Sequence, residues 1–547
     1  MALPILCLSS VGCSPPDRGE GDGPPQPTLA PTRGYILISA DTLRADRLGS
    51  YGHWRDTSPH LDALAAEGVV FERAFASAPS TLISHMSMFT GLHPGQHGVD
   101  GPRNNVLPAE VTTLPEIFQH AGYRTSGHTE GGYMNGAHGF ARGFDVFTDS
   151  PWQSVTDVEA TFRHGTDFLR DLGPDDPFFL FLHTYTIHDP YEPPEEERAS
   201  FADDGEDLDF RPSGHALAEV NQGRRVLTEG QGKRLGALYD AGIYYFDGVL
   251  GRFLDELEDL GLRDEVTLVL TSDHGEEFLE HGRLLHTQVY PEGLHVPLLV
   301  LHPDAAPRRI EAPVRIIDIA PTLWGLAGLD GVETTGRSLV TYLAGGELEE
   351  TDAYGEVNFD SSQKTLVGRY DGVLYQLVSR RPLTDPDGGT WVGESLDFEA
   401  SSERLEFRAL AYHEPRTIEL RFGDQLLRTV EVAPDRWSSV TVELPPDPRP
   451  LALRLSSPSC VSPKEVGAGE DIRCLAFKVA GLPLAELELY DLDADPGAEV
   501  NLAQERPDVL RRLARRLSSQ RHEPVAQPGR RELSEEEVKA LEALGYL

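Results

Sequence analysis

The chain has 547 residues, with 48 basic and 89 acidic side chains and a formal charge of −41. This length predicts two or three domains rather than one core, and a hydrophobic content of 39% is ordinary for a globular protein. Because the acidic residues are spread along the chain, the charge excludes nucleic acid and anionic membrane surfaces as general partners. An enzyme with this charge needs a metal ion or local basic residues to attract an anionic substrate.

The first 13 residues form a short apolar run that ends in small residues and Cys13. The segment 1–13 resembles the end of a bacterial lipoprotein signal in which Cys13 carries the lipid, and the alternative is a disordered terminus. Residues 14–33 are rich in Pro and Gly, which is typical of a tether. We therefore expect an exported protein, periplasmic or at the cell surface, with Cys13 as the candidate site of a lipid anchor.

Residues 34–345 alternate short apolar runs with amphipathic stretches, a pattern that predicts strands and helices in turn. Strands are expected at 35–38, 178–185, 266–275 and 296–303, and helices at 58–69 and 233–260. This alternation predicts an α/β domain with a mostly parallel sheet flanked by helices. Because sites in such folds form at the carboxyl ends of strands, the polar residues that follow these runs are candidates for function.

The pattern changes after residue 345, where we expect a smaller C-terminal subdomain, 346–547. Between 390 and 480, apolar and polar residues alternate in runs that turn signals separate, which predicts an inserted β-sandwich. Cys460 and Cys474 are close enough in sequence to close a small disulfide loop in an oxidising compartment. Two helices are expected at the end of the chain, the last starting at Ser534.

Three clusters along the α/β domain could build a metal site together. Asp41 ends the first strand, Asp273 and His274 end a later one, and TLISHMSMFTG (81–91) lies between them in sequence. Carboxylates and an imidazole at strand ends can bind a divalent cation. A hydroxyl held against such a cation can lose its proton near neutral pH and become a nucleophile. Because an Asp–His pair alone is as often a buried hydrogen-bonded pair, the prediction depends on all three clusters.

Seven segments follow one another in the order of the landmarks of a known family. They are DTLRADRLGSYG (41–52), TLISHMSMFTGLHPGQHGV (81–99), HTYTIHDPYEPP (183–194), SDHGEEFLEHG (272–282), HVPLLVLHP (295–303), DIAPTLWGLAGL (318–329) and LYDLDADPGAEVNLA (489–503). The chain thus resembles the sulfatase family of the alkaline-phosphatase-like superfamily over most of its length outside the tether and the β-rich insert. This resemblance implies an alkaline-phosphatase/sulfatase-like α/β fold and hydrolysis of sulfuric or phosphoric esters.

The nucleophile segment departs from the family pattern. Sulfatases of the usual type carry Cys or Ser in C/S-x-P-x-R, which is converted to formylglycine. Counted back from the Thr90–Gly91 anchor, the resemblance places Thr81 at the nucleophile position, Ile83 at the proline and His85 at the arginine. Because a threonine cannot yield formylglycine, that group is not expected. Thr81 instead resembles the threonine of relatives that act on phosphate esters, whose hydroxyl attacks directly.

Carried over position by position, the resemblance implies four metal ligands: Asp41, Thr81, Asp273 and His274. The family's second N-terminal aspartate is Thr42 in this chain. An imidazole with few carboxylates suits zinc or manganese at least as well as the calcium typical of sulfatases. We therefore expect one divalent metal ion, which is calcium, manganese or zinc.

The resemblance also assigns three histidines. His188, in the H-D-P-Y string, matches a family histidine that contacts the substrate, and it is the candidate general acid because an imidazole titrates near neutral pH. The alternative is a histidine that only closes the loop before Pro190. His286 stands near the family's substrate lysine and His85 replaces the arginine, so both could supply positive charge when protonated. The family's Lys-x-His pair after G-Y-R-T is absent, since SGHTEGGY (126–133) follows instead.

These assignments predict a metal-dependent esterase in which Thr81 attacks sulfur or phosphorus and His188 protonates the leaving oxygen. The expected substrate is a small-molecule, glycan-linked or lipid-linked sulfate or phosphate ester. Two alternatives stay open. One is a phosphoethanolamine- or phosphoglycerol-type transferase that uses the same covalent intermediate. The other is a non-catalytic surface protein that uses the fold to bind a ligand.

Overall fold

The computed structural model describes residues 29–531 apart from 102–104, 150–156, 202–204, 358–361, 382–388, 393–394, 401–403, 424, 435, 447–450, 461–475, 481–485, 521 and 523. The lipoprotein-like segment with Cys13, most of the tether, Cys474 and the helix expected at Ser534 lie outside the described residues. Among the described helices, none combines the length and the apolar composition that crossing a bilayer requires.

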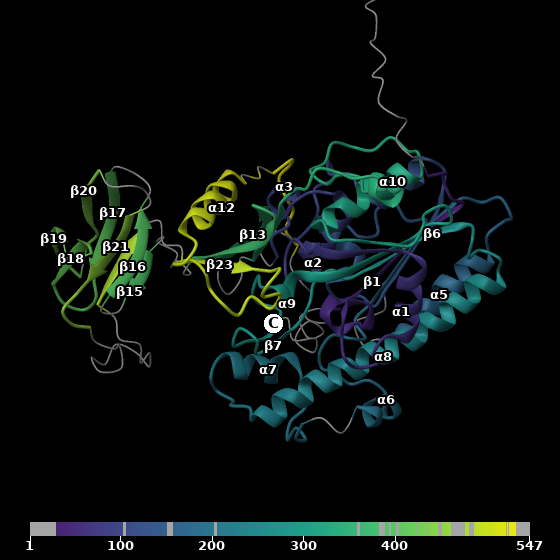
Figure 1. The fold of residues 1–547 in the computed structure, drawn as a ribbon, viewed down its shortest axis with the longest axis horizontal. Helices are drawn as coiled ribbons and strands as arrows, with labels where there is room; N and C mark the ends of the chain where they lie inside the picture. Colours follow the sequence, from purple (N-terminus) through teal and green to yellow (C-terminus); the bar gives the residue numbers. More distant parts are fainter. Residues whose placement is uncertain are drawn as a thin grey trace, which may run out of the picture.

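A nine-stranded sheet forms the centre of the α/β domain (Figure 1). Its order is β10 (Arg308–Ile310), β2 (Val69–Phe75), β9 (His295–Leu301), β6 (Val266–Thr271), β1 (Gly34–Ala40), β5 (Phe178–Thr184), β3 (Arg124–Thr129) and β4 (Val146–Asp149), with β11 (Val314–Arg315) beside β2. β1 pairs in parallel with β5 and β6, whereas β9 runs antiparallel to β2 and β6. The predicted mostly parallel sheet is therefore confirmed.

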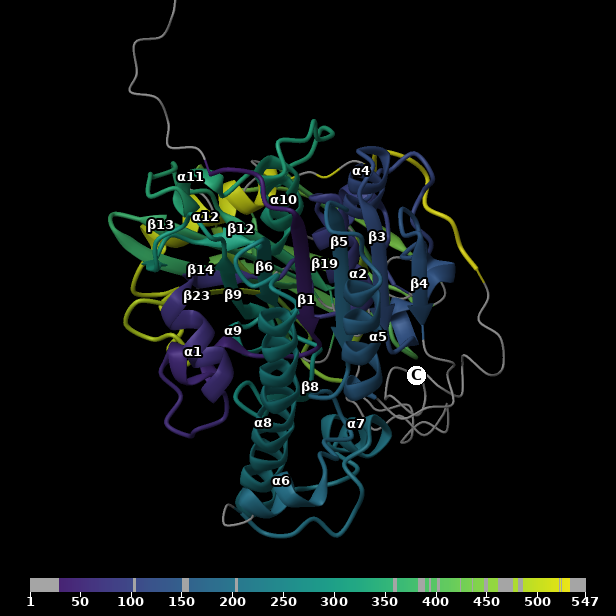
Figure 2. The same ribbon diagram turned by 90° about the vertical axis from the view of Figure 1, so that its right-hand side faces the viewer.

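Helices cover both faces of this sheet, because successive side chains of a strand point to opposite faces. Ile36 and Ile38 of β1 pack on the side of α1, α5 and α8, and Tyr35 and Leu37 pack on the side of α2, α4 and α10. In Figure 1 the long helix α8 lies below the sheet and α10 above it, and Figure 2 shows α8 passing in front of the sheet. The bounds are α1 (Pro59–Glu67), α2 (Thr81–Thr90), α4 (Leu114–His120), α5 (Val158–Arg170), α8 (Glu229–Asp259) and α10 (Ile319–Leu326).

Short elements fill the connections between these layers. The helices among them are α3 (Pro94–His97), α6 (Glu195–Ser200), α7 (Gly214–Asn221), α9 (Pro291–Leu294) and α11 (Val340–Leu343). The strands β7 (Glu277–Phe278) and β8 (Leu284–Leu285) form a hairpin between β6 and β9. This hairpin lies in the segment that carries the predicted residues Asp273, His274 and His286.

A second sheet follows the α/β domain and was missed by the sequence analysis. Its strands, all antiparallel, are β12 (Ala353–Val357), β13 (Ser362–Tyr370), β14 (Val373–Arg381) and β23 (Glu486–Asp491). Val367 and Val378 face the core of the α/β domain, while Leu366 and Leu377 face helix α12 (Pro507–Ser519). Because both faces are buried, the strands lack a clear apolar–polar alternation. This change of architecture supports the boundary that we propose near residue 345.

Two four-stranded antiparallel sheets form the predicted β-sandwich. One contains β15 (Gly389–Val392), β22 (Phe477–Ala480), β17 (Arg404–Ala411) and β20 (Ser438–Glu443), and the other β16 (Ser395–Ala400), β21 (Leu451–Ser456), β18 (Arg416–Phe422) and β19 (Gln425–Val432). Phe407, Ile418 and Val440 are among the residues of its core, which are buried at alternate strand positions. Cys460, which packs against this core, is disulfide-bonded.

The Asp247 side chain of α8 is hydrogen-bonded to backbone N–H groups in the first turn of α1. Its carboxylate accepts hydrogen bonds from the N–H groups of His60 (2.9 Å) and Leu61 (2.8 Å), and the side chain is fully buried. The Ser58 side chain at the N-cap of α1 makes no capping bond, so Asp247 satisfies donors that a cap usually serves.

We expect Asp247→Ala to lower the free energy of unfolding by about 1–3 kcal/mol, because the buried N–H of Leu61 and the partly buried N–H of His60 lose their acceptor. Urea unfolding of the variant and the parent measures this difference. Asp255→Ala, which removes an exposed carboxylate from the same helix, is the matched control. Equal stability of the two variants would contradict the capping role of Asp247.

Candidate active site

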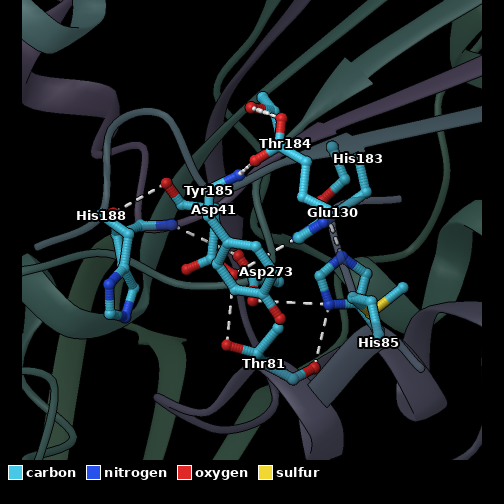
Figure 3. A network of polar contacts seen from close by, with 12 residues as sticks. Asp41, Thr81, His85, Glu130, His183, Thr184, Tyr185, His188 and Asp273 are labelled. Atoms are coloured by element: carbon cyan, nitrogen blue, oxygen red, sulfur yellow. Dashed lines mark hydrogen bonds and ion pairs between the residues drawn. The ribbon is translucent and has the colours of Figure 1, made fainter. Parts of the chain in front are cut away.

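The predicted ligands meet at one edge of the central sheet. Asp41 directly follows β1, and Asp273 and His274 follow the adjacent parallel strand β6. Parallel neighbours end at the same edge, so their C-terminal residues lie side by side. Thr81 is the first residue of α2, and its side chain points toward Asp41 (Figure 3).

Thr81, Asp41, Asp273 and His274 are fully buried and lie close together. The Thr81 hydroxyl donates a hydrogen bond to Asp41 Oδ2 (3.1 Å), and its oxygen lies 3.4 Å from His274 Nε2. His274 Nε2 also lies 3.3 Å from Asp273 Oδ2. The structure thus brings together four predicted residues that come from three separate segments of the chain.

The donor set of this cluster fits a divalent cation. One ligand atom from each of Asp41, Asp273 and His274 can be chosen so that all three lie within 4.8 Å of one another. Asp41 Oδ1 and Asp273 Oδ2 are buried and accept no hydrogen bond from the residues that the structure describes. His274 donates from Nδ1 to the Gly275 carbonyl (2.9 Å), which leaves the lone pair of Nε2 facing the carboxylates. A hydrogen bond from the ring nitrogen that faces away from the ligand site is typical of a metal-binding histidine.

The pKa shifts of Asp41 and Asp273 indicate that a positive charge close to both carboxylates would stabilise the site. Burial, followed by the nearby Asp273, raises the pKa of Asp41 well above its ordinary value. Burial also acts to raise the pKa of Asp273, but His274, His85 and His183 outweigh it and hold the pKa below its ordinary value. Two buried carboxylates this close favour sharing one negative charge unless a cation offsets both.

His85 lies one turn along α2 from Thr81 and beneath the carboxylates. Its Nδ1 donates to the Thr81 carbonyl (2.9 Å), and its Nε2 lies 2.9 Å from Ser39 Oγ. Burial lowers the pKa of His85 to about 3. The imidazole is therefore neutral at physiological pH, contrary to the cationic role expected for it.

His188 and His286 line the cluster on the side of His274. The ring centres of His274 and His286 are 4.5 Å apart, and those of His286 and His188 are 5.1 Å apart. Burial and the nearby His286 lower the pKa of His188 to about 4, and its Nδ1 donates to the Asp189 carbonyl (3.0 Å). His286 Nδ1 lies 3.3 Å from Glu276 Oε1.

Two buried residues of this region were not singled out by the sequence analysis. His183 is the last residue but one of β5, and its Nε2 lies 3.3 Å from Asp41 Oδ2. Glu276 is buried beside His286 and directly follows Gly275. His183 lies in the segment 183–194 near the end of β5, and Glu276 lies in the segment 272–282 after β6, so their place in these segments was the available signal.

Sequence comparisons identify relatives along the part of the chain that builds this site. The profile of the sulfatase family matches residues 33–329, which is more than half of the chain. The chain is 25% identical to the uncharacterized sulfatase YidJ of Escherichia coli over 346 residues, covering 55% of this chain and 68% of that protein. It is also 25% identical to an arylsulfatase of Clostridium perfringens over 365 residues, covering 54% of this chain and 76% of that enzyme.

Solved structures share the fold at low identity. One, BT4656 in complex with its substrate D-glucosamine-2-N,6-O-disulfate, is 16% identical, with a TM-score of 0.60 over 89% of this chain and 97% of that one. The phosphonate monoester hydrolase of Agrobacterium radiobacter is 20% identical, with a TM-score of 0.57 over 89% of this chain and 95% of that one. With the family profile across the α/β domain and this shared fold, the chain belongs to the sulfatase family of hydrolases that act on sulfate or phosphate esters.

Proposed function

We propose that this hydrolase is metal-dependent and that Thr81 is its nucleophile. The observation that carries the proposal is the contact of the Thr81 hydroxyl with Asp41 Oδ2 (3.1 Å) inside a cluster of carboxylates that lacks a positive charge. Thr81 also begins α2, whose N-terminal N–H groups and dipole favour negative charge on the hydroxyl oxygen. No formylglycine is required, because the threonine hydroxyl is itself the attacking group.

Asp41, Asp273 and His274, with Thr81, are the residues that would hold the cation. A bound divalent ion would supply charge that favours the ionised Thr81 hydroxyl and offsets the charge that develops on the ester. With one imidazole among the ligands, zinc and manganese fit at least as well as calcium. His85 and His183 are hydrogen-bonded beneath this set and orient Thr81 and Asp41.

The reaction follows from the positions of Thr81 and His188. The Thr81 hydroxyl first loses its proton to bulk water. The ionised Thr81 Oγ1 forms a bond to phosphorus or sulfur, the bond to the leaving oxygen breaks, and that oxygen takes a proton from His188 Nε2. Water then attacks the Thr81 ester and gives one proton to His188 Nε2, and the bond to Thr81 Oγ1 breaks, which restores the ionised Thr81 and the protonated His188. In the free chain His188 is neutral because its pKa is about 4. An anionic ester beside the ring raises that pKa, so His188 becomes protonated when the substrate binds.

A threonine nucleophile makes phosphomonoesters, phosphodiesters or phosphonates more natural substrates than sulfates. Thr81 stands where sulfatases of the usual type carry formylglycine, and the neutral His85 stands in place of their arginine. The substrate itself is a small molecule or a glycan- or lipid-linked ester. The names of the relatives, an arylsulfatase and a phosphonate monoester hydrolase, span both chemistries.

Purified protein is expected to hydrolyse aryl phosphate or phosphonate esters in the presence of manganese or zinc, and Thr81→Ala to lower kcat by about 10³-fold or more because the attacking oxygen is lost. Paired aryl sulfate, phosphate monoester, phosphate diester and phosphonate substrates measure the selectivity. Thr81→Ser, which keeps the hydroxyl, is the matched control. Turnover that survives in Thr81→Ala would rule out this nucleophile.

Asp273→Asn is expected to lose both bound metal and turnover, because an amide in place of the carboxylate weakens the ligand set. Metal content after equilibrium dialysis and a thermal melt separate loss of the ion from loss of the fold. Thr81→Ala should keep most of the metal, since three ligands remain. If Asp273→Asn keeps a full complement of metal, the assigned ligand set is wrong; if the parent chain shows no turnover at all, the non-catalytic alternative gains support.

We further propose that the protein is exported, which the disulfide-bonded Cys460 supports because disulfides persist in oxidising compartments. Fractionation of the producing cells is expected to place the protein in the periplasm or at the cell surface. Detection in the cytoplasm, with Cys460 open to alkylation before reduction, contradicts export.

A further inference from the structure

Glu130 is a buried carboxylate that the proposed mechanism does not use. It follows β3 within the segment 126–133, where the family's Lys-x-His pair is absent, and only 8% of its surface is exposed. Its Oε1 accepts hydrogen bonds from the hydroxyls of Thr184 (2.7 Å) and Thr161 (3.4 Å), and its Oε2 accepts from the Tyr185 N–H (2.8 Å). Figure 3 shows Glu130 beside Thr184.

The residues that are hydrogen-bonded to Glu130 are themselves hydrogen-bonded to residues of the site. The Thr184 carbonyl accepts a hydrogen bond from the backbone N–H of Asp41 (3.0 Å), and the Tyr185 carbonyl accepts one from the backbone N–H of His188 (2.9 Å). The Tyr185 ring also packs against the rings of His183 (4.7 Å) and His188 (5.9 Å). A shift of the segment 184–185 therefore moves the ligand Asp41 and the proton donor His188 together.

Burying the Glu130 carboxylate is unfavourable for stability when it is ionised. Burial raises the pKa of Glu130 to about 7, in spite of the hydrogen bonds from Thr184 and Tyr185, and the nearby Asp157 carboxylate at the N-cap of α5 adds to the effect. Within the described residues no Lys or Arg forms an ion pair with Glu130. A glutamine would fill the same space without the charge, but it offers only one acceptor oxygen to the two donors at Thr184 and Tyr185.

We propose that Glu130 is a positioning residue, whose carboxylate holds Thr184 and Tyr185 so that Asp41 and His188 face the substrate correctly. This inference rests on the proposed function for its catalytic consequence. The structural part does not, since the hydrogen bonds at Thr184 and Tyr185 exist whatever ester is hydrolysed.

Glu130→Gln is expected to lower kcat about tenfold and Glu130→Ala about a hundredfold, with KM within about threefold of the parent, because small misplacements of reacting groups mainly affect the transition state. Glu159→Gln, which removes an exposed carboxylate on α5, is the matched control and should leave kcat unchanged. A kcat within twofold of the parent in both Glu130 variants overturns the proposal.

Two readouts do not depend on turnover. Hydrogen exchange of the Tyr185 amide should be faster in Glu130→Ala, because its acceptor is gone. The folded chain holds the Glu130 proton more tightly, with a pKa of about 7 against an ordinary value of 4.5, so it loses stability as the pH rises between these values. The fall in Tm from about pH 5 to about pH 8 should therefore be smaller in Glu130→Gln than in the parent.

These readouts separate the two ideas. Lower kcat with equal or higher Tm at the upper pH supports positioning, whereas kcat and Tm that fall together show a merely structural role and overturn it. Unchanged exchange at Tyr185 also overturns it. If hydrolysis itself is absent or survives in Thr81→Ala, the proposed function fails, and the exchange and Tm results still decide the role of Glu130.

Discussion

Asp41 and Asp273 face each other at the ends of two adjacent parallel strands, fully buried, and the organisation of the site depends on this pair. Two carboxylates so placed repel each other and lose their hydration, which is strongly unfavourable unless opposite charge is close by. Within the described chain no Lys or Arg forms an ion pair with either one. The fold therefore maintains a strong local demand for a cation, and it places the Thr81 hydroxyl where that cation would act.

The surrounding histidines stabilise the two carboxylates only in part. Burial lowers the pKa of His85 to about 3 and that of His183 to about 4, so both rings are neutral donors at physiological pH. Neutral rings can hold Asp41 and the Thr81 backbone in place by hydrogen bonds, but they cannot neutralise a buried charge. The imidazoles therefore orient the site, and in the function we propose a bound cation would offset the charge of the carboxylates.

The C-terminal sheet supports the site from outside the α/β domain. His281 lies on the segment between β7 and β8, and its Nδ1 is 2.6 Å from Glu292 Oε1 while its Nε2 donates to the Ala498 carbonyl (2.9 Å). The ring of His281 stacks on Tyr290, with 3.6 Å between ring centres, and the Tyr290 hydroxyl donates to Glu488 of β23 (2.5 Å). These contacts tie the segment that carries Glu276 and His286 to the second sheet, so the small C-terminal region contributes to the geometry of the site.

The sequence by itself determined the parallel strands, the β-sandwich and the identity of Asp41, Thr81, Asp273 and His274 as candidate ligands. It could do so because these are local signals: strands buried on both faces are continuous apolar runs, and parallel strands bring their ends to one edge. Tertiary structure alone decided the protonation of His85 and His188 and the place of His183 and Glu276. It also decided the hydrogen bonds of Glu130 with Thr184 and Tyr185. Those features depend on burial and on contacts between segments far apart in the chain, and neither is written in the local pattern of residues.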